Sequence, residues 1–578
     1  MSRRNEEVGA LFDEYADLLA ITGGDPFKIR AYQKAGRAVG SYHEDVGLLD
    51  VKQLCRIPNV GRAIAEKIVE YVRTGRVRAV EDARAKIPPG LRELTTIPTL
   101  GPRKAMQLHE LLGISSVPEL IDAIDAGLLR ELRGFGARTE ERIRRGIELM
   151  PNAGGRVHVN VAAELAGRIV AELSTVDGCV RCAPAGSLRR LRETVGDVDI
   201  LAAAEDSGPL MAAFAGMSIV DSVANEVVAG GARKTSIRTA GGLQVDLRVV
   251  PPGSWGAALQ YFTGSREHNV RVRELAVRAG LKLNEYGLFD AGTGEVLAAE
   301  TEEQVYARLG MAWVPPALRE DRGEVEAALR GELPALVTED DIRGDLHTHT
   351  DLTDGVSSLT EMLAGAAARG YSYYAVTDHA PNLFMQRMTD EKMLRQRAEL
   401  RALDGRYGPM RLLHGTELNI DPDGEVDWPV EILRRFDVCV ASVHSHFRQP
   451  RAEMTRRIVR ACENPGVNII GHLTTRQIGR RGPIDVDLDE VFRAAARTGT
   501  ALEINSHPDR LDLCDEHILR ARRFGARFAV NSDAHSVLHL DLLRYGIGNA
   551  QRGWLTADDV INTWPLERLR AFLAKPGP

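Results

Sequence analysis

The sequence predicts a multidomain protein with a helical N-terminal region, an α+β unit in the middle and a C-terminal barrel of alternating strands and helices. Three observations support this prediction. The 578 residues exceed what one hydrophobic core usually organises. Short helical stretches broken by Gly and Pro fill residues 1–150. After Ile342, short apolar strands alternate with helical stretches to the end of the chain.

Composition and charge narrow the class of protein. Hydrophobic residues make up 44% and charged residues 27%, which is typical of a folded soluble protein. No apolar run approaches the roughly 20 residues needed to cross a bilayer, so we expect no membrane partner. The first residues lack a signal peptide's apolar core, and six cysteines are too few for a disulfide framework, so we expect a cytoplasmic monomer. With a net charge of -7, any binding to nucleic acid depends on local geometry.

Turn-forming clusters such as PNAGG at 151–155 mark boundaries between structural units. A Pro-marked, charged stretch precedes the barrel and reads as a linker that becomes a helix. The expected units are a helical domain at 1–80, a second helical unit at 81–150, an α+β unit at 151–252, its extension at 253–318, a linker at 319–341 and the barrel at 342–578.

Three segments of the N-terminal region repeat one pattern, in which an apolar residue and a short Gly turn precede a helix. They are IPNVGRAIAEKI at 57–68, IPTLGPRKAMQL at 97–108 and LRGFGARTEERI at 132–143, with turn glycines Gly61, Gly101 and Gly136. Glycine lets the backbone approach a ligand closely, and a helix start presents unpaired N–H groups that suit phosphate. The segments resemble helix-hairpin-helix motifs, which hold nucleic-acid backbone; an αα-hairpin turn that only packs is the alternative.

The first of these segments has a further resemblance. PFKIRAYQKA at 26–35, followed by NVGRAIAEKIVEYVRTG at 59–75, resembles the N-terminal lyase domain of DNA polymerase beta. The resemblance implies that Lys67 is the amine that attacks an abasic sugar aldehyde, which requires a neutral amine. A solvated helix charge is the alternative, and Ala63 replaces a second lysine of that domain. The residues implied to hold the 5′-phosphate of a gap are Lys28 and Tyr32.

Three aspartates on two predicted strands indicate a metal site. Asp197 and Asp199 are two positions apart on one strand, so their side chains point to the same face. VDLRVV at 245–250 places Asp246 on another strand. Because three carboxylates on one face repel one another unless cations lie between them, the pattern predicts divalent ions and in-line phosphoryl transfer. Gly186 and Ser187 precede the first strand, with Arg189 or Arg190 close behind, and these residues suit phosphate oxygens.

These residues, together with YFTGSREHN at 261–269, are similar to the nucleotidyl-transfer site of family X DNA polymerases. The resemblance implies a lyase-like domain at 1–80, fingers at 81–150, a nucleotidyltransferase palm at 151–252 and a nucleotide-selecting thumb at 253–318. It implies Mg²⁺ or Mn²⁺ at the aspartates, with deoxynucleoside triphosphates and gapped or nicked DNA as substrates.

Within the shared motif, the resemblance implies that Tyr261 and Phe262 exclude a 2′-hydroxyl and that Asn269 bonds the minor-groove edge of the incoming base. Ser187 and Arg190 are implied to hold the β- and γ-phosphates. Two departures from the family pattern are Gln244, in place of an arginine near the primer end, and Arg266, in place of a small or acidic residue. We expect Arg266 to stack on the base or to contact the triphosphate. Gly264 lies in the same motif and is counted among the nucleotide-binding residues.

Residues able to bind metal recur at the ends of predicted strands in the C-terminal third. They are His347, His349, Asp354, His379, Glu417, His444, His472, Asp533 and His535. A single histidine here would more often be structural, but nine such residues at strand ends are hard to explain without metals, because barrel enzymes assemble their sites there. Mixed imidazole and carboxylate ligands suit Zn²⁺, Mn²⁺ or iron.

This ligand pattern resembles the PHP domain, named for polymerase and histidinol phosphatase. The resemblance implies a (β/α)7 barrel holding up to three metal ions that hydrolyses phosphoesters, with 3′→5′ exonuclease activity and, in some members, abasic-site cleavage or 3′-phosphate removal. TTRQIGRRGP at 474–483 adds Arg476, Arg480 and Arg481 as an expected grip on the DNA backbone. Four further histidines of this region, His414, His446, His507 and His539, match no ligand position.

The two resemblances cover nearly the whole chain, in the order polymerase and then PHP, which is the arrangement of bacterial family X DNA polymerases. The sequence therefore predicts a gap-filling repair polymerase fused to a metal-dependent nuclease. Two alternatives remain open at this stage. One is a phosphoesterase whose polymerase half is inactive, and the other is a non-catalytic scaffold that binds DNA ends.

Overall fold

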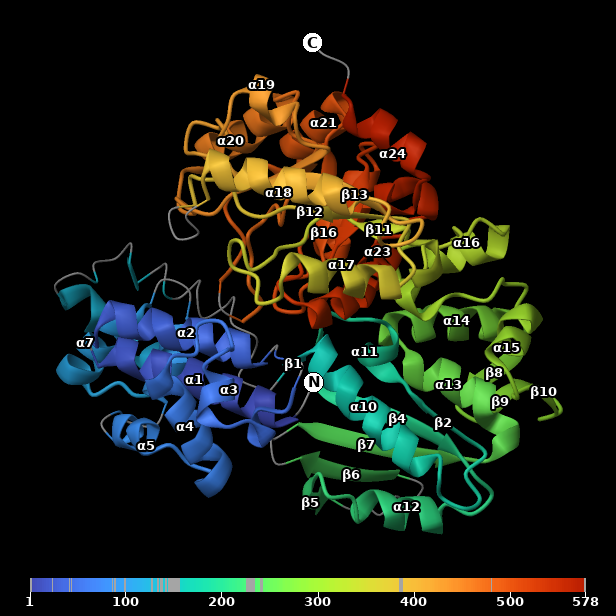
Figure 1. The fold of residues 1–578 in the computed structure, drawn as a ribbon. Coiled ribbons are helices and arrows are strands. Elements are labelled where there is room, and N and C mark those ends of the chain that lie inside the picture. The colour runs from blue at the N-terminus through green and yellow to red at the C-terminus, as the bar shows by residue number, and fades with distance from the viewer. Residues whose placement is uncertain are drawn as a thin grey trace.

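The computed structural model places the helical N-terminal region, the barrel and the α+β unit around one another (Figure 1). In Figure 1 the N-terminal helices lie on the left, the barrel above and the α+β unit at the lower right. The structure describes residues 3–22, 24–40, 42, 44–85, 87, 90–97, 100–125, 128–132, 135, 139–140, 143, 156–224, 234–239, 243–383, 388–479 and 481–575. No helix in these ranges is long and apolar enough to cross a membrane.

The N-terminal region is helical, as predicted. Its helices are α1 (Arg3–Ile21), α2 (Pro26–Gly40), η1 (Val46–Leu48), α3 (Val51–Leu54), α4 (Arg62–Thr74), α5 (Arg78–Arg84), α6 (Leu91–Thr96), α7 (Pro102–Leu112), α8 (Val117–Asp125) and η2 (Leu128–Glu131). One apolar core runs through them, with Phe12 of α1 fully buried. The repeated Gly turns precede helices as expected, because Gly61 is the N-cap of α4 and Gly101 that of α7.

The palm is a five-stranded sheet with order β2-β4-β7-β6-β5. Its strands are β2 (Arg181–Pro184), β4 (Asp197–Ala203), β5 (Val220–Ala224), β6 (Lys234–Thr239) and β7 (Gln244–Val250), with the short pair β1 (Val157–His158) and β3 (Thr194–Val195) beside it. Its helices are α10 (Val159–Leu173), α11 (Gly186–Arg189) and α12 (Gly208–Ala215). The central strands β4 and β7 run parallel with Asp199 opposite Asp246, so the predicted aspartates meet on one face.

The thumb follows the palm without a break. Its elements are η3 (Pro252–Ser254), α13 (Trp255–Thr263), α14 (Arg266–Arg278), β8 (Leu281–Asn284), β9 (Gly287–Asp290), β10 (Val296–Ala298), α15 (Glu302–Arg308), η4 (Pro316–Leu318) and α16 (Glu324–Arg330). The segment 319–341, expected to be a linker, differs from the prediction. Arg319 is fully buried and Val325 belongs to the thumb core, so the thumb extends through α16. The stretch resembled a linker because the partners of its charges lie elsewhere in the chain: Arg319 pairs with Glu302, and Glu324 pairs with His268.

Glu302 organises these buried charges. Its carboxylate accepts hydrogen bonds from Arg189 and Arg319 at 2.7–2.8 Å and from Trp313 at 3.0 Å. Burial alone would raise the pKa of Glu302, but the hydrogen bonds and charges of Arg189 and Arg319 outweigh it and lower the pKa to about 2. The palm helix α11 and the thumb are thereby joined through one carboxylate.

This arrangement predicts a specific acid sensitivity. Because the folded-state pKa of Glu302 lies below its unfolded value, its contribution is complete above about pH 4.5 and disappears as the pH falls towards about 2, a total on the order of 3 kcal/mol. We expect Glu302→Gln to unfold at a lower temperature at pH 7 and to lose less stability between pH 5 and pH 3 than wild type. Thermal unfolding across that range measures this, and identical acid slopes would contradict it.

The barrel has seven parallel strands that neighbour one another in chain order. They are β11 (Gly344–Asp345), β12 (Tyr373–Val376), β13 (Arg411–Asn419), β14 (Val438–Ser442), β15 (Ile469–Ile470), β16 (Ala501–Asn505) and β17 (Phe528–Asn531). A parallel bridge between Thr348 and Ala534 brings the chain after β11 to the chain after β17, so the sheet nearly closes. The fold therefore agrees with the predicted (β/α)7 barrel, and its strand ends meet on one side.

Helices cover the outside of this barrel (Figure 1). They are η5 (Glu339–Asp341), α17 (Leu359–Ala368), α18 (Asp390–Leu403), α19 (Val430–Leu433), α20 (Arg451–Glu463), α21 (Leu488–Thr498), α22 (Asp515–Arg522), η6 (Val537–Leu542), α23 (Leu543–Arg552), η7 (Ala557–Asp559), η8 (Ile561–Thr563) and α24 (Leu566–Leu573). Apolar side chains of the strands fill the inside, and Trp564 and Leu569 pack against this inner cluster. The barrel is thus a packed core rather than a pore.

Buried ion pairs join the barrel to the polymerase half. Arg552, at the end of α23, donates to Glu320 at 2.8 Å, to Asp515 at 2.6 Å and to the carbonyl of Arg190 at 2.7 Å. Only 3% of Arg552 is exposed. The Arg190 side chain itself lies 3.1 Å from Glu320. A barrel residue therefore holds both the backbone and the ion-pair partner of a predicted phosphate-binding arginine.

We expect Arg552→Ala to weaken primer extension more than nuclease activity. The change leaves Glu320 and Asp515 buried with fewer partners, which typically costs about 3–5 kcal/mol, and it loosens Arg190. Steady-state extension should show a higher KM for the nucleotide, with partial recovery in Arg552→Lys. Arg523→Ala, an exposed arginine of the barrel, is the matched control. An unchanged KM in Arg552→Ala would contradict the expectation.

Candidate active sites: two clusters of metal ligands

The first candidate site is formed by three carboxylates of the palm. Oxygen atoms of Asp197, Asp199 and Asp246 lie within 4.8 Å of one another. The parallel pairing of β4 with β7 brings Asp246 beside Asp199, and the alternation of side chains along β4 adds Asp197. Asp197 is exposed and Asp246 is buried, so the cluster opens to solvent at one side. This is the convergence that the sequence predicts.

The electrostatics of this cluster fit divalent cations. Burial raises the pKa of Asp199 to about 6, and the nearby charges of Asp197 and Asp246 add to the rise. A cation between the carboxylates would remove the repulsion that adds to this shift. For Asp246, burial also acts to raise the pKa, but hydrogen bonds from Ser236, Lys234 and Gln244 outweigh it and lower the pKa.

Gly186 is held against this cluster. It adopts a left-handed conformation with φ of 57°, and a Cβ atom added there would lie 2.0 Å from Asp199 Oδ2. Only glycine therefore lets helix α11 approach Asp199 this closely. Ser187 follows Gly186 directly in the first turn of α11, where helix N–H groups have no partner within the helix. The geometry suits a phosphate chain placed beside metal ions.

Gln244, which departs from the family pattern, contacts the cluster directly. Its Nε2 donates to Asp246 Oδ1 at 3.0 Å, and Lys234 Nζ lies 3.1 Å from Asp246 Oδ2. The amide and the ammonium together fix the orientation of the Asp246 carboxylate. Sequence reasoning identified Gln244 as a departure but did not identify its partner, and Lys234 was missed.

The predicted nucleotide motif lies at the junction of α13 and α14. Tyr261 and Phe262 meet edge to face with ring centroids 5.1 Å apart, and Arg248 of β7 lies 4.5 Å from the Phe262 ring. Asn269 is 8% exposed and donates to the Tyr261 carbonyl at 2.7 Å, while it accepts from Gln260. Asn269 therefore fixes the turn that carries the two aromatic rings.

Two predicted phosphate contacts lie beside this junction. Arg190 donates to the carbonyl of Thr263 at 2.5 Å, and Gly264, with φ of 69°, lies so close that an added Cβ would be 3.0 Å from Arg190. Arg266 begins α14 and is exposed. Arg190 also donates through Nε to Glu320 at 3.1 Å, and its Nη2 takes no part in these two bonds.

The second candidate site lies at the strand ends of the barrel. Three groups of ligand atoms each lie within 4.8 Å. The groups are His349, Asp354, His379 and His535; His347, His349 and Asp533; and His379, Glu417 and His444. Two histidines are shared between groups, so the three sites adjoin. The ligands are those predicted from the sequence, and three adjoining groups fit the expected number of ions.

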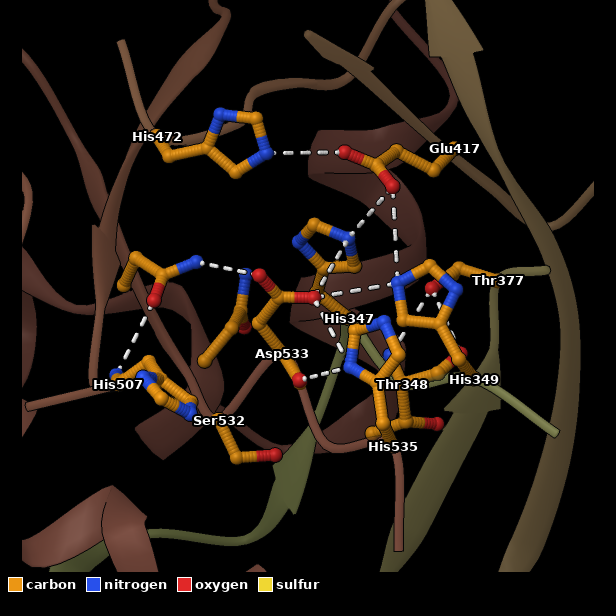
Figure 2. Close-up of polar contacts among 12 residues, drawn as sticks. His347, Thr348, His349, Thr377, Glu417, His472, His507, Ser532, Asp533 and His535 are labelled. Atoms are coloured by element: carbon orange, nitrogen blue, oxygen red, sulfur yellow. Dashed lines mark hydrogen bonds and ion pairs between the residues drawn. The ribbon is translucent and has the colours of Figure 1, made fainter. Parts of the chain in front are cut away.

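The carboxylate of Glu417 contacts several imidazoles of this cluster (Figure 2). Its Oε1 lies 3.0 Å from His444 Nε2 and 3.1 Å from His472 Nε2, and its Oε2 lies 3.0 Å from His379 Nδ1. This contact brings His472, the ninth predicted ligand, into the cluster. Burial alone would raise the pKa of Glu417, but the imidazoles of His444, His379 and His347 outweigh it and lower the pKa.

The imidazole nitrogens of this cluster fit metal binding. Among the residues that the structure describes, five buried nitrogens of this cluster have no hydrogen-bond partner: His347 Nε2, His349 Nδ1 and Nε2, His379 Nδ1 and His472 Nδ1. Buried polar atoms are nearly always paired in proteins, so such a concentration requires an explanation. Divalent metal ions would account for it, because neutral imidazole nitrogens and carboxylates are donors that such ions accept.

Residues behind the ligands were missed by sequence reasoning. Glu503 of β16 is fully buried and lies 2.6 Å from His347 Nδ1, which directs Nε2 of that histidine towards Asp533. Asn505 donates to Asp533 at 3.0 Å, and Asn419 lies 2.7 Å from His444 Nδ1. Such partners orient metal ligands. A buried carboxylate in the strand ALEIN was the available signal.

The predicted lyase residues lie on the N-terminal helices. Lys67 is half-buried on α4 and donates to the Ala63 carbonyl at 3.3 Å. Lys28 is exposed and lies 5.8 Å from the centre of the Tyr15 ring. Tyr32 is 4% exposed and packs edge to face on Tyr15. Burial of Tyr32 indicates that its ring stabilises the helix pair.

The predicted DNA contacts near the barrel differ from one another. Arg476 differs from its predicted role as a DNA contact, because its guanidinium binds Glu193 of the palm at 2.6 Å and the carbonyls of Arg510 and Leu511. It is therefore an interdomain contact rather than a residue directed at DNA. Arg481 donates to the Thr475 carbonyl and lies over the Phe447 ring. Arg480 and Gly136 lie outside the described residues.

Comparison with known proteins extends these observations. Family models match residues 3–77 as a helix-hairpin-helix domain, 91–148 as a SAM-like helix-hairpin-helix tandem, 258–320 as a DNA polymerase beta thumb and 345–507 as a PHP domain. The chain is 32% identical to the DNA polymerase/3′-5′ exonuclease PolX of Bacillus subtilis over 573 residues, which cover 99% of both chains. The chain belongs to the family X DNA polymerases that carry a PHP domain.

Two further relatives cover parts of the chain. Rat DNA polymerase lambda is 28% identical over 322 residues, which cover 51% of this chain and 53% of that protein. A probable phosphatase of Thermoanaerobacter is 30% identical over 232 residues, which cover 38% of this chain and 89% of that protein. The family thus combines a polymerase part and a phosphatase-like part, and both parts of this chain contain ligand clusters.

Proposed function

We propose that this protein is a template-directed, gap-filling DNA polymerase of DNA repair whose barrel is a 3′→5′ exonuclease. The observation that carries the proposal is the pair of separate ligand clusters, one on the palm sheet and one at the barrel mouth. Its similarity over 99% of its length to a polymerase that is also an exonuclease supports both halves. We propose gapped or nicked DNA and deoxynucleoside triphosphates as substrates, and a cytoplasmic monomer as the acting form.

In the polymerase half, Asp197, Asp199 and Asp246 would hold two Mg²⁺ or Mn²⁺ ions. Ions bound there would activate the primer 3′-hydroxyl and neutralise the triphosphate. The residues of the chain itself position the triphosphate beside these ions. Gly186 lets α11 approach the aspartates, so that Ser187 and the helix N–H groups can bind the β- and γ-phosphates.

Residues at the α13–α14 junction would select the nucleotide. The rings of Tyr261 and Phe262 would lie against the sugar, and their bulk excludes a 2′-hydroxyl. Asn269 anchors Tyr261 in this structure and would exchange that bond for the minor-groove edge of the base. Arg190, which is held beside this junction by its bond to the Thr263 carbonyl, would bind the triphosphate.

In the barrel, nine side chains would hold up to three ions of Zn²⁺, Mn²⁺ or iron. Ions bound there would activate water for attack on phosphorus and neutralise the phosphodiester. Glu503 fixes the His347 ring and Asn419 fixes the His444 ring, so the ligand nitrogens are oriented before an ion binds. The product of each cleavage is a nucleoside 5′-monophosphate.

Two further activities belong to the proposal. Lys67 is the proposed nucleophile of a lyase step, and abasic-site cleavage is a further proposed activity of the barrel.

Four one-nucleotide gaps that differ only in the template base test the polymerase proposal. We expect incorporation of the complementary deoxynucleotide in each gap and discrimination against the ribonucleotide. A mismatched 3′ end, labelled at its last nucleotide, tests the exonuclease through release of the labelled nucleoside monophosphate. Incorporation that ignored the template base would contradict a template-directed enzyme.

Similarity of the barrel to probable phosphatases supports one alternative, a phosphoesterase with an inactive polymerase half. That enzyme would release phosphate from 3′-phosphorylated ends or small esters and would incorporate nothing into any gap. The four-gap experiment separates the two, because they differ in extension rather than in hydrolysis.

A further inference from the structure

The barrel ligands open into a cavity of about 1080 Å³ whose walls come from three parts of the chain. His379, Glu417 and Asp533 are among the ligands at its floor. The walls include residues of the N-terminal helical domain and of the β1–β3 pair of the palm. Pockets for small molecules usually measure about 300–1,000 Å³, so this cavity has room for more than one phosphoester group.

The N-terminal domain contributes cations to this cavity. Lys34 and Arg37 of α2 line it, together with Pro58 and Asn59 from the turn of the first helix-hairpin-helix motif. Among the described residues, the Lys34 ammonium makes no hydrogen bond or ion pair. The turn that resembles a backbone-binding motif therefore faces the barrel's ligand cluster.

The palm contributes a third cation. Arg156 lines the same cavity, and its Nε and Nη2 are anchored on Thr194 at 3.0 Å and 2.6 Å. Its remaining nitrogen, Nη1, is not used in these bonds. An arginine fixed in this way presents a preorganised donor to an anion.

Packing holds the N-terminal domain at the cavity. Val356 of the barrel packs against the N-terminal apolar core, and it lies two residues after the ligand Asp354. The loop that carries a ligand is thus also the surface on which the N-terminal domain rests. This contact places α2 beside the ligands in the assembled chain.

The charges of the residues that line the cavity indicate which class of ligand it binds. Of the six described carboxylates that line the cavity, Asp354, Glu417 and Asp533 belong to the metal clusters, Asp509 is paired with His507 at 2.5 Å, and Asp13 and Asp351 remain. Four cations of the described residues line it as well: Lys34, Arg37, Arg156 and Arg510. Cationic walls above a floor of metal ligands suit a chain of phosphates. No Phe, Tyr or Trp is among the described lining residues, so bases would not be selected by aromatic stacking.

We propose that this cavity binds the last few nucleotides of a single-stranded 3′ end, with backbone phosphates held by Lys34, Arg37 and Arg156. The N-terminal domain and the palm are then parts of the exonuclease's substrate site. This inference rests on the proposed exonuclease and adds its substrate class and the residues that grip it. It predicts cleavage without base preference and only of ends that are frayed or unpaired.

The test compares two substrates in the full-length enzyme with Mn²⁺. A 5′-labelled oligothymidylate reaches the walls, whereas the p-nitrophenyl ester of thymidine 5′-monophosphate reaches only the floor. We expect the Lys34→Ala/Arg37→Ala double variant to raise the KM for the oligonucleotide at least 10-fold and to leave hydrolysis of the ester unchanged. Its salt dependence should weaken by about 1.4 in the slope of log affinity against log salt, since each single-strand phosphate contact contributes about 0.7.

Arg156→Gln, a change in a different domain, should show the same separation of the two substrates. Arg30→Ala, an exposed arginine on the same helix α2 that does not line the cavity, is the matched control. An oligonucleotide KM within twofold of wild type in both variants would overturn the site. An equal loss on both substrates would also overturn it, because the residues would then act on the floor rather than on the strand. Wild-type enzyme that cleaved neither substrate would overturn the exonuclease itself.

Discussion

We expect the Asp199→Asn variant to extend a primer in a gapped duplex at least roughly 10³-fold more slowly than wild type. Asp199 lies between Asp197 and Asp246, and its pKa of about 6 reflects burial and their charges, so it is the carboxylate that most needs a cation. An amide there weakens the binding of divalent ions that position the 3′-hydroxyl and the triphosphate. Single-nucleotide incorporation in Mg²⁺, measured over a short time course, gives the rate.

The matched control is Glu205→Gln, which changes an exposed carboxylate just beyond the same strand β4. That variant should extend normally. Nuclease activity of Asp199→Asn should stay within about twofold of wild type, because the barrel ligands are separate from the palm cluster. Extension by Asp199→Asn at the wild-type rate would show that the palm cluster is not the polymerase site.

Glu417→Gln should abolish the nuclease activity and leave primer extension intact. Glu417 contacts His379, His444 and His472, so the change removes the one carboxylate that joins these three imidazoles. We expect 3′ shortening of a labelled primer to fall at least roughly 10³-fold, because the neutral amide is a poor ligand and leaves the imidazoles without their counter-charge. Primer shortening in Mn²⁺ without nucleotides measures it.

Glu425→Gln, an exposed change in the loop after β13, is the matched control for this site. Primer extension by Glu417→Gln should remain within about twofold of wild type. Simultaneous loss of extension and shortening, with the variant folded, would instead indicate that the barrel serves mainly to support the polymerase half through Arg552 and Glu320.

The ligand clusters could be predicted because they follow from local rules. Asp197 and Asp199 share a face by the alternation of a strand, and Asp246 follows from a second apolar strand. The barrel ligands stand at strand ends, and the side of a barrel on which strand ends meet is fixed by its topology. Both the identity of the ligand residues and their place in the fold could therefore be predicted from short stretches of sequence.

The supporting contacts could not be predicted, because their partners are far apart in the chain. Arg552 binds Glu320 across 232 positions, and Arg476 binds Glu193 across 283. An arginine destined for a buried ion pair and one directed at DNA look alike in sequence, which is why Arg476 was predicted to grip DNA. The same limit made 319–341 resemble a linker, since only the fold shows that Arg319 is buried against Glu302.

The most direct test of two independent sites in one chain uses a single gapped duplex labelled at the primer 5′ end. Wild-type protein is incubated with Mn²⁺, with and without deoxynucleoside triphosphates. We predict a longer primer with nucleotides and a shorter one without them, with Asp199→Asn losing only the first and Glu417→Gln only the second. Shortening without any extension by the wild type would contradict the account and leave the polymerase half as a DNA clamp for the barrel.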